Sequence, residues 1–377
     1  MNSKVKHKPL IGILTTTSSN SPHTPFGSRT GWIRQLVRAG SIRGKCYAFT
    51  PTSIDWTRKT VSAWAYSGNT GWHRRTMPLP EVVYNRLPGR RAEKSEPILR
   101  LKSKLSDHQI PIFNWSFFEK NDMHRRLSNS PDALRHIPET IPAPSDKDIR
   151  GLLMKHRHVY LKPAFGSLGI GIYRMTYSSS DGYLLRFRKN GRTTVMHWDS
   201  FAKMMHYLHR RSGRLRNHIV QQGIDLVQID GSPLDFRFHL NKTRNNRWTV
   251  AGIGAKRAAR GGVTTHIHSG GAVYAPLVAL EKVYDQEKAR SKLQQAKNVA
   301  ISLAEAVERN YPHLLGELGL DLGIDRDGHI WMFEVNSKPG RSIYKHPALR
   351  KDGRSTLRHL LNYCAYLSKA GRARRVR

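Results

Sequence analysis

The segment of residues 319–336 restricts the fold more than any other feature, because it consists of two apolar stretches that carry carboxylates. Between the stretches lies Asp327–Gly328, a strong signal for the tight turn of an antiparallel hairpin. Side chains two positions apart on a strand point the same way, so Glu334 and Asn336 share one face. The same turn folds Asp321 back beside Glu334. The sequence therefore predicts a hairpin that gathers two carboxylates and one amide on an otherwise apolar surface.

A buried carboxylate requires a partner, and the charge of this segment is unusual for the chain. The chain holds 64 Lys and Arg against 27 Asp and Glu, yet acids predominate here. Two carboxylates and an amide oxygen suit Mg²⁺, which keeps water and phosphate oxygens as its other ligands. We therefore expect one or two Mg²⁺ ions, with Mn²⁺ as a substitute, at Asp321, Glu334 and Asn336. The other carboxylates, for which we expect ordinary salt bridges, are Glu317, Asp325 and Asp327.

The formal net charge of +37 predicts an anionic partner, surface or substrate, because self-repulsion at that charge needs relief. Cys46 and Cys364 stand far apart without metal-type spacing, which argues against a disulfide framework and fits a reducing interior. The apolar run at the N-terminus is too short for a signal-peptide core. No transmembrane segment is expected, since no stretch is long enough to cross a bilayer. These features predict a soluble, cytoplasmic protein.

The order of periodic segments predicts a mixed α/β (α+β) protein. A strand in "LIGIL", a helix capped by Ser28 and ended by Gly40, and a strand in "CYAFTP" predict a small N-terminal α/β domain. The longest helix is expected over residues 286–309, where one face is apolar. The predicted divisions are an N-terminal domain, two further lobes and a mobile basic tail, at residues 1–110, 111–222, 223–365 and 366–377.

A glycine-rich loop, "KPAFGSLGIG", begins at Lys162 and lies between two expected strands. Glycines allow the backbone to approach a ligand and point amides at it, and a lysine supplies a point charge for phosphate. No Gly-Lys-Ser/Thr follows, so the loop is not a Walker loop, and the strand after it excludes a dinucleotide fingerprint. The pattern fits the triphosphate of ATP lying under a flap. The alternative is an ordinary glycine-rich hairpin with a surface lysine.

The motifs occur in the order of the ATP-grasp superfamily: a lysine before a glycine flap, then "DFR", then an aspartate strand and "EVNSKPG". More narrowly, "VVYNR", "YLKPAFGSLGIGI", "IVQQGIDL", "DFRFHLNK", "TTHIHSGG" and "FEVNSKPG" resemble the YheC/YheD family, which is associated with bacterial endospore coats. The resemblance covers most of the chain. It implies an ATP-grasp fold of two α+β lobes preceded by a small N-terminal α/β domain.

The resemblance also implies roles for individual residues. Arg237 matches an arginine that steadies the transferring phosphate, Lys256 lies where relatives carry a basic residue near the γ-phosphate, and Asp321, Glu334 and Asn336 match the metal ligands. The residues that match the ATP site, from the phosphate lysines and the flap to the adenine hinge and a ribose-binding acid, are Lys120, Lys162, Gly166, Ser167, Gly169, Gly171, Gln221, Gln222, Gly223, Ile224 and Asp225.

Two departures from the superfamily pattern bear on the reaction. Gln222 stands where many members have glutamate, and Gly319 stands where peptide-forming ligases have an arginine. His266 and His268 share a strand face, for which a substrate-lining or structural role is favoured over a metal.

The resemblance implies an ATP-dependent enzyme that joins a carboxylate to an amine, or to a thiol, through an acyl phosphate. Its acceptor and donor substrates stay open, and an anionic one would suit the charge. One alternative is a spore-coat or polyanion-binding structural protein that retains the ATP-binding fold. Another is an ATP-grasp phosphotransferase acting on a hydroxyl.

Overall fold

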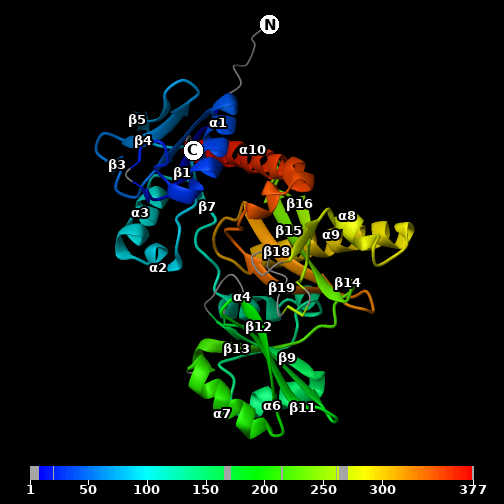
Figure 1. Ribbon diagram of the computed structural model, residues 1–377. Helices are drawn as coiled ribbons and strands as arrows, with labels where there is room; N and C mark the ends of the chain where they lie inside the picture. The colour runs from blue at the N-terminus through cyan, green and yellow to red at the C-terminus, as the bar shows by residue number, and fades with distance from the viewer. Residues whose placement is uncertain are drawn as a thin grey trace.

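The computed structural model describes residues 8–19, 21–164, 171–213, 215–259, 261–262 and 271–375. Three β-sheets follow one another along the chain, each with its own helices (Figure 1). The first sheet extends from residue 10 to residue 113, the second from 140 to 222 and the third from 228 to 336. Whether these units fold as separate domains, as the divisions at residues 110, 222 and 365 imply, stays a prediction.

The first sheet has parallel strands at its centre, with order β3-β4-β2-β1-β6-β7 and β5 paired to β4. Its strands are β1 Leu10–Leu14, β2 Lys45–Phe49, β3 Ile54–Asp55, β4 Thr60–Ser67, β5 Gly71–Pro78, β6 Val82–Asn85 and β7 Ile112–Phe113. Its helices are η1 Gly27–Arg29, α1 Thr30–Arg43, α2 Arg90–Glu93 and α3 Glu96–Asp107.

Helix α1 differs from the prediction at both ends. The short helix η1 contains Ser28, so Ser28 is not the N-cap of α1, and α1 continues through Gly40 to Arg43. A Cβ atom at Gly40 would lie 2.6 Å from the Cys46 Cβ. Gly40 is therefore required for close packing of α1 on β2, whereas the helix ends before Gly44.

The second sheet has the order β12-β11-β10-β9-β13-β8. Its strands are β8 Thr140–Pro142, β9 His158–Pro163, β10 Tyr173–Ser178, β11 Gly182–Lys189, β12 Arg192–Trp198 and β13 His218–Gln222. Helices α6 Asp146–His156 and α7 Phe201–Ser212 pack on one of its faces, η2 Leu215–Asn217 precedes β13, and apolar side chains from both helices and from β9, β10 and β11 form a single core. The opposite face of this sheet remains available to line a cleft.

The third sheet has the order β17-β16-β15-β18-β19, with β14 paired to β15. Its strands are β14 Gln228–Ile229, β15 Ser232–Lys242, β16 Trp248–Arg257, β17 Ala272–Tyr274, β18 Glu317–Ile324 and β19 Ile330–Asn336. The predicted long helix is confirmed as α9 Gln286–Arg309, whose small residues pack on this sheet. Helices α4 Lys120–Ser128, α5 Pro131–Leu134 and α8 Pro276–Leu280 belong to the same core region.

The C-terminal segment is helical rather than a mobile tail. After η4 Ser342–Lys345 and η5 Pro347–Leu349, helix α10 runs over Arg350–Arg375 and crosses from the third sheet to the first (Figure 1). Its apolar stripe, which includes Leu360, Cys364 and Leu367, is buried in the core of the first sheet. The described residues from 367 to 375, basic ones included, therefore extend a packed helix. In the described part of the chain, no helix is long and apolar enough to span a membrane.

Candidate functional site

A cleft of about 1430 Å³ lies between the second and third sheets and reaches the first. The second sheet contributes Lys162, and the segment after β13 contributes Ile224. The cleft gathers most of the described residues that the sequence singled out. These are Lys162, Gln221, Gln222, Ile224, Asp225, Arg237, Lys256, Asp321, Glu334 and Asn336.

The β18–β19 hairpin has the predicted pairing. Asp321 lies directly opposite Glu334 in the antiparallel register, and Gly319 lies opposite Asn336. A turn closes the hairpin, with the amide of Gly328 donating to the carbonyl of Asp325 at 3.0 Å. The positive φ of 85° at Gly328 is a conformation that favours glycine. The predicted convergence of the two carboxylates is therefore confirmed.

Asp321 is held by two cations, Arg237 from the neighbouring strand β15 and Lys256 from β16, one strand further. The Arg237 guanidinium donates to both carboxylate oxygens, at 2.8 Å from Nε and 2.6 Å from a terminal nitrogen, and Lys256 Nζ lies 3.2 Å from Oδ1. Burial acts to raise the pKa of the Asp321 carboxyl, but the charges of Arg237 and Lys256 outweigh it and hold this pKa well below its usual range. Asp321 is therefore ionised at neutral pH and fixed in direction.

Asp235 belongs to the same cluster, although the sequence did not single it out. Its carboxylate lies 2.9 Å from Lys256 Nζ, and the two residues are paired across β15 and β16. Burial acts to lower the pKa of Lys256, but the charges of Asp235 and Asp321 raise it above its ordinary value. The available signal was spacing, because Asp235 stands two positions before Arg237 on one strand and thus on the same face.

The donor set fits a hard divalent cation. Glu334 and Asn336 are half-buried, share a face of β19 and line the cleft beside Asp321. Within the described residues, no group of three or more His, Cys, Asp or Glu is placed to hold a metal ion, so the predicted set depends on the Asn336 amide as its third donor. Arg237 contacts both oxygens of Asp321, and an ion there would share that carboxylate with the guanidinium.

The opposite wall of the cleft presents Lys162 from β9. Its Nζ donates to Oε1 of Gln221 at 2.6 Å and lies 5.2 Å from the centre of the Tyr160 ring. The Gln221 amide nitrogen in turn donates to Thr140 Oγ1 at 3.0 Å. These contacts position the Lys162 charge at the cleft, as a phosphate-binding lysine requires.

The predicted hinge, Gln221 to Ile224, is the end of β13 and the segment that leads to the third sheet. Gln222 is tied to Glu139 through its backbone amide at 2.8 Å and its side-chain oxygen at 3.1 Å. A Cβ atom at Gly223 would lie 1.9 Å from the His158 ring, so only glycine fits there. Asp225 is 71% exposed in its side chain and lines the cleft. Adenine and ribose binding by this segment stays a prediction.

Part of the predicted flap lies outside the described residues: Gly166, Ser167 and Gly169. His266 and His268 also lie outside them. Gly171, the last residue of the predicted flap, has a positive φ of 73°, and a Cβ atom there would lie 3.0 Å from the Pro163 ring. Lys120 is the first residue of α4, and its side chain is not among those described.

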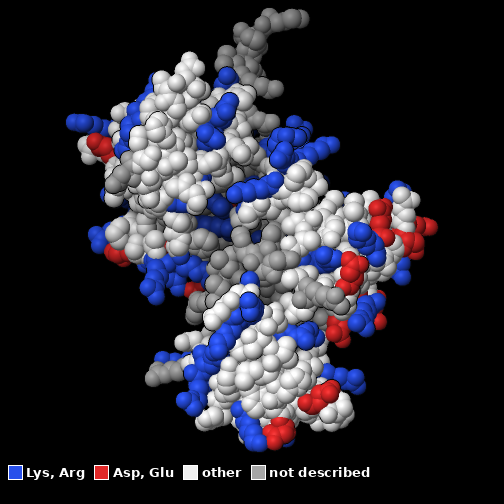
Figure 2. All heavy atoms as spheres, viewed as in Figure 1, with Lys and Arg blue, Asp and Glu red and all other residues white. Residues whose placement is uncertain are grey.

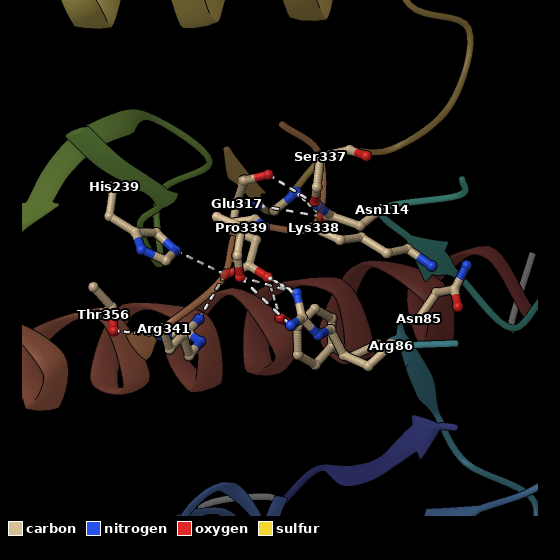
Figure 3. A network of polar contacts seen from close by, with 12 residues as sticks. Asn85, Arg86, Asn114, His239, Glu317, Ser337, Lys338, Pro339, Arg341 and Thr356 are labelled. Atoms are coloured by element: carbon tan, nitrogen blue, oxygen red, sulfur yellow. Dashed lines mark hydrogen bonds and ion pairs between the residues drawn. The ribbon is translucent and has the colours of Figure 1, made fainter. Parts of the chain in front are cut away.

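A second buried network joins the first sheet to the third, and its centre is Glu317 (Figure 3). The Glu317 carboxylate accepts from Arg341 at 2.6 Å, from Arg86 at 3.2 Å and from the Tyr84 hydroxyl, and His239 Nε2 lies 3.2 Å away. The expected salt bridge of Glu317 is thereby confirmed.

Asp325 differs from its prediction. Among the described residues it forms no ion pair; its carboxylate accepts from Trp331 Nε1 at 2.7 Å and from the backbone amides of Asp327 and His329 at 3.0 and 2.8 Å. The turn thus supplies three N–H donors to the Asp325 carboxylate, which satisfy it in place of a cation.

Three consecutive α/β units, with a cleft between the second and third sheets and an Asp-Glu-Asn set on one wall, define a protein of the ATP-grasp class. D-alanyl-alanine synthetase A from Vibrio cholerae has this fold with a TM-score of 0.50 at 13% identity, covering 94% of this chain and 99% of that one. The predicted fold is thereby confirmed.

The chain belongs to the family described as YheC/D like ATP-grasp, whose model matches residues 109–367. The endospore coat-associated protein YheD of Bacillus subtilis (strain 168) is 36% identical over 372 residues, which cover 96% of this chain and 79% of that protein. The endospore coat-associated protein YheC of the same organism is 24% identical over 309 residues, covering 78% of this chain and 80% of that protein. These findings confirm the resemblance that the motifs indicate.

Proposed function

We propose that the chain is an ATP-dependent ligase that activates a carboxylate as an acyl phosphate, which an amine or a thiol then attacks. The observation that carries the proposal is the juxtaposition across the cleft: Lys162 on one wall, and on the other Asp321 in register with Glu334 and paired with Arg237. This arrangement suits charge neutralisation of a triphosphate, which is the main task of a protein in phosphoryl transfer.

The residues of the third sheet would act on the phosphates. Arg237 offers a planar fork of donors that matches a phosphate, and Lys256 a point charge, and both are oriented by Asp235 and Asp321. Mg²⁺, held by Asp321, Glu334 and Asn336, would neutralise phosphate charge when bound. Lys162 approaches from the facing wall. A nucleotide in the cleft would therefore meet cations from both sheets.

The second substrate would occupy the part of the cleft next to the first sheet. Arg90, Lys94, Lys102 and Trp115 line the cleft there, which suits a substrate that carries anionic groups. Lys102 Nζ donates to the Trp115 carbonyl at 2.7 Å and lies 4.9 Å from the centre of its ring. Glu93 and Glu119 line the same part of the cleft, and Lys94 is paired with Glu119. Under this proposal, Arg90 and Lys102 of the N-terminal unit would therefore bind the anionic group.

Product analysis tests the reaction class. The protein, ATP and Mg²⁺ are incubated with pools of carboxylates and amines or thiols, and ADP, inorganic phosphate and new mass are measured. A ligase releases ADP and phosphate in equal amounts with a condensed product, whereas a phosphotransferase releases ADP and a phosphorylated product. Glu334→Gln should abolish turnover, and an unchanged rate in this variant would contradict its assignment as a ligand. Glu305→Gln, an exposed position on α9, is the matched control.

A second candidate function, binding of an acidic polymer in a spore coat, is favoured by the surface of α10. Its exposed face carries cations over about 28 Å of helix, and Lys and Arg gather over this region in Figure 2. The one acid of the helix, Asp352, is half-buried and accepts from the Ile253 amide at 3.2 Å. Among the side chains of α10 that the structure describes, the exposed cations are Arg350, Lys351, Arg354, Arg358 and Lys369. Both curated relatives are named as endospore coat-associated.

Binding to poly-glutamate over a range of salt concentrations tests this candidate. Affinity should fall steeply with salt, and should fall at constant salt when Arg350, Arg354 and Arg358 are replaced by Gln. A control with the same loss of charge replaces Arg58, Arg100 and Arg135, each of which lies in an exposed ion pair. Equal losses in both triple variants would indicate only a response to net charge.

A further inference from the structure

One face of the second sheet carries a row of four side chains, of which the nucleotide assignment uses only Gln221. In the antiparallel register, Gln221 of β13 lies opposite Tyr160 of β9, Tyr160 opposite Arg174 of β10, and Arg174 opposite Arg186 of β11. All four line the cleft. The odd-numbered neighbours Tyr173, Met175, Leu185 and Phe187 are directed to the opposite face, where they form the core with α6 and α7. The alternation of the strands thus directs two arginines into the cleft side by side.

The two arginines have no acidic counterpart. Within the described part of the chain, no carboxylate forms an ion pair with Arg174 or Arg186, and the Nε of Arg174 is buried without a hydrogen-bond partner. Asp225 also lines the cleft, but its carboxylate lies 3.9 Å from the His158 ring and forms no ion pair with either arginine among the described residues. Like charges directly opposite on neighbouring strands destabilise a sheet, and a buried donor without a partner adds to the cost. The fold therefore maintains an unfavourable pair at the wall of a cleft.

Other arginines of the same hairpin show that this arrangement is particular to the pair. Arg188 and Arg192 are exposed, and Arg188 Nε donates to the Gly191 carbonyl at 3.2 Å. Lys162, the lysine of the neighbouring strand β9, donates a hydrogen bond to Gln221. The charges of Arg174 and Arg186 also act on the Tyr160 hydroxyl, lowering a pKa that burial raises. In the strand register Arg174 is therefore flanked by Tyr160 on one side and by Arg186 on the other, and all three line the cleft.

We propose that Arg174 and Arg186 together bind one anionic group, a phosphate or a carboxylate, of a ligand held in the cleft. Two guanidinium groups side by side offer parallel N–H donors that match such an anion, and its charge removes their mutual repulsion. The anion belongs either to the nucleotide or to the second substrate. The inference rests on the proposed function only in taking this cleft as the ligand site.

Calorimetric titrations separate the two sources. ATP, AMP and adenosine are titrated into the wild type, Arg174→Gln, Arg186→Gln and the control Arg192→Gln. If the anion is a nucleotide phosphate, either cleft variant weakens ATP about ten- to hundredfold; AMP weakens equally if that phosphate is the α-phosphate and is unaffected otherwise, and adenosine is unaffected in both cases. If it belongs to the second substrate, these affinities stay constant, and glutarate titrated in the presence of Mg²⁺-ADP binds the wild type and the control but not the cleft variants. An equal loss of adenosine affinity would indicate damage to the site and overturn the proposal.

Thermal unfolding provides a readout that does not depend on ATP binding. Without added anions, Arg186→Gln should raise Tm by about 1–2 °C because it relieves the like-charge pair. Pyrophosphate should raise the Tm of the wild type and of Arg192→Gln by the same amount, and that of the Arg174→Gln/Arg186→Gln variant by clearly less, since Lys162, Arg237 and Lys256 remain in the cleft. A wild type that fails to bind ATP but is stabilised in this way would contradict the proposed function and not the anion site. If no probe distinguishes the cleft variants from Arg192→Gln, the proposal is wrong.

Discussion

Strand β18 carries two buried carboxylates four residues apart. One belongs to a structural network and the other to the candidate functional site. Glu317 and Asp321 lie on the same face of the strand, and each is surrounded by basic groups that lower the pKa of its carboxyl, against the effect of burial, to well below the usual range. Glu317 is completely buried between the first and third sheets, whereas Asp321 lines the cleft. A strongly lowered pKa therefore does not by itself distinguish a functional carboxylate from a structural one. The two carboxylates differ instead in access: a ligand in the cleft can reach Asp321 but not Glu317.

The largest effect on stability is expected from Glu317→Gln. The substitution leaves Arg86 and Arg341 without their shared buried counter-charge, which costs about 3–5 kcal/mol of unfolding free energy. The two arginines lie between the first and third sheets, whereas the nucleotide cleft lies between the second and third. The substitution should therefore change ATP affinity little. Urea unfolding measures the loss, and Glu305→Gln, exposed on α9, should be neutral within about 0.5 kcal/mol. If Glu317→Gln lost more binding free energy for ATP than unfolding free energy, the distinction between the two carboxylates would be contradicted.

The same variant should change the pH dependence of stability. The pKa of Glu317 is lowered in the folded state, so its contribution is present above about pH 4.3, the unfolded value, and is lost as pH falls through the folded pKa. Burial lowers the pKa of His239 to about 4, so the unfolded state binds more protons between pH 6.5 and 4, and stability falls there as well. The difference between wild type and Glu317→Gln should therefore be largest near pH 7 and shrink below pH 4. A difference that grows on acidification would have the wrong sign.

The hairpin could be predicted because its signals are local. Asp327–Gly328 and the alternation on either side determine the pairing of Asp321 with Glu334 without reference to the rest of the chain. The partners of these carboxylates are distant in sequence: Arg237 precedes Asp321 by 84 positions and Arg86 precedes Glu317 by 231. No local pattern encodes such contacts, and Arg237 was found only through the resemblance.

The arginine pair of the second sheet was missed for a different reason. Strands β11 and β12 were not predicted, although Asn190–Gly191 between them is a hairpin signal, and both residues have positive φ. That signal would have predicted a strand around Arg186. Its register with Arg174 would have stayed unknown, since a shift of one residue reverses the faces. The helical end of α10 was missed because its cations obscured the buried stripe that packs on the first sheet.

Asp321→Asn should reverse the pattern of Glu317→Gln. It removes the charge that orients Arg237 and Lys256, at a cost of about 2–3 kcal/mol in unfolding free energy, and it should abolish Mg²⁺-dependent ATP binding. Calorimetry and urea unfolding on the same preparations give the two quantities. Asp327→Asn, exposed in the turn of the hairpin, is the control and should match the wild type in both. Retained Mg²⁺-dependent binding in Asp321→Asn would place the metal elsewhere.

The smallest effect is expected from Asp325→Ala, which changes a third carboxylate four residues further along. This side chain fixes the turn through Trp331 and two backbone amides, so its loss should cost about 1–2 kcal/mol without a change in ATP affinity. Thermal and urea unfolding measure the cost against Asp327→Ala, a neighbour in the same turn. Weaker ATP binding in Asp325→Ala alone would show that the turn itself contributes to the site.

The most direct test of the nucleotide site is calorimetric titration of ATP with and without Mg²⁺. The wild type should bind ATP in a Mg²⁺-dependent manner, and the variant Lys162→Ala/Glu334→Gln, which changes both walls of the cleft, should not. Lys203→Ala/Glu305→Gln alters one exposed lysine and one exposed glutamate away from the cleft and should behave as the wild type. A wild type that does not bind ATP, or a cleft variant that binds it equally well, would contradict the account and leave the fold as a scaffold for an acidic partner.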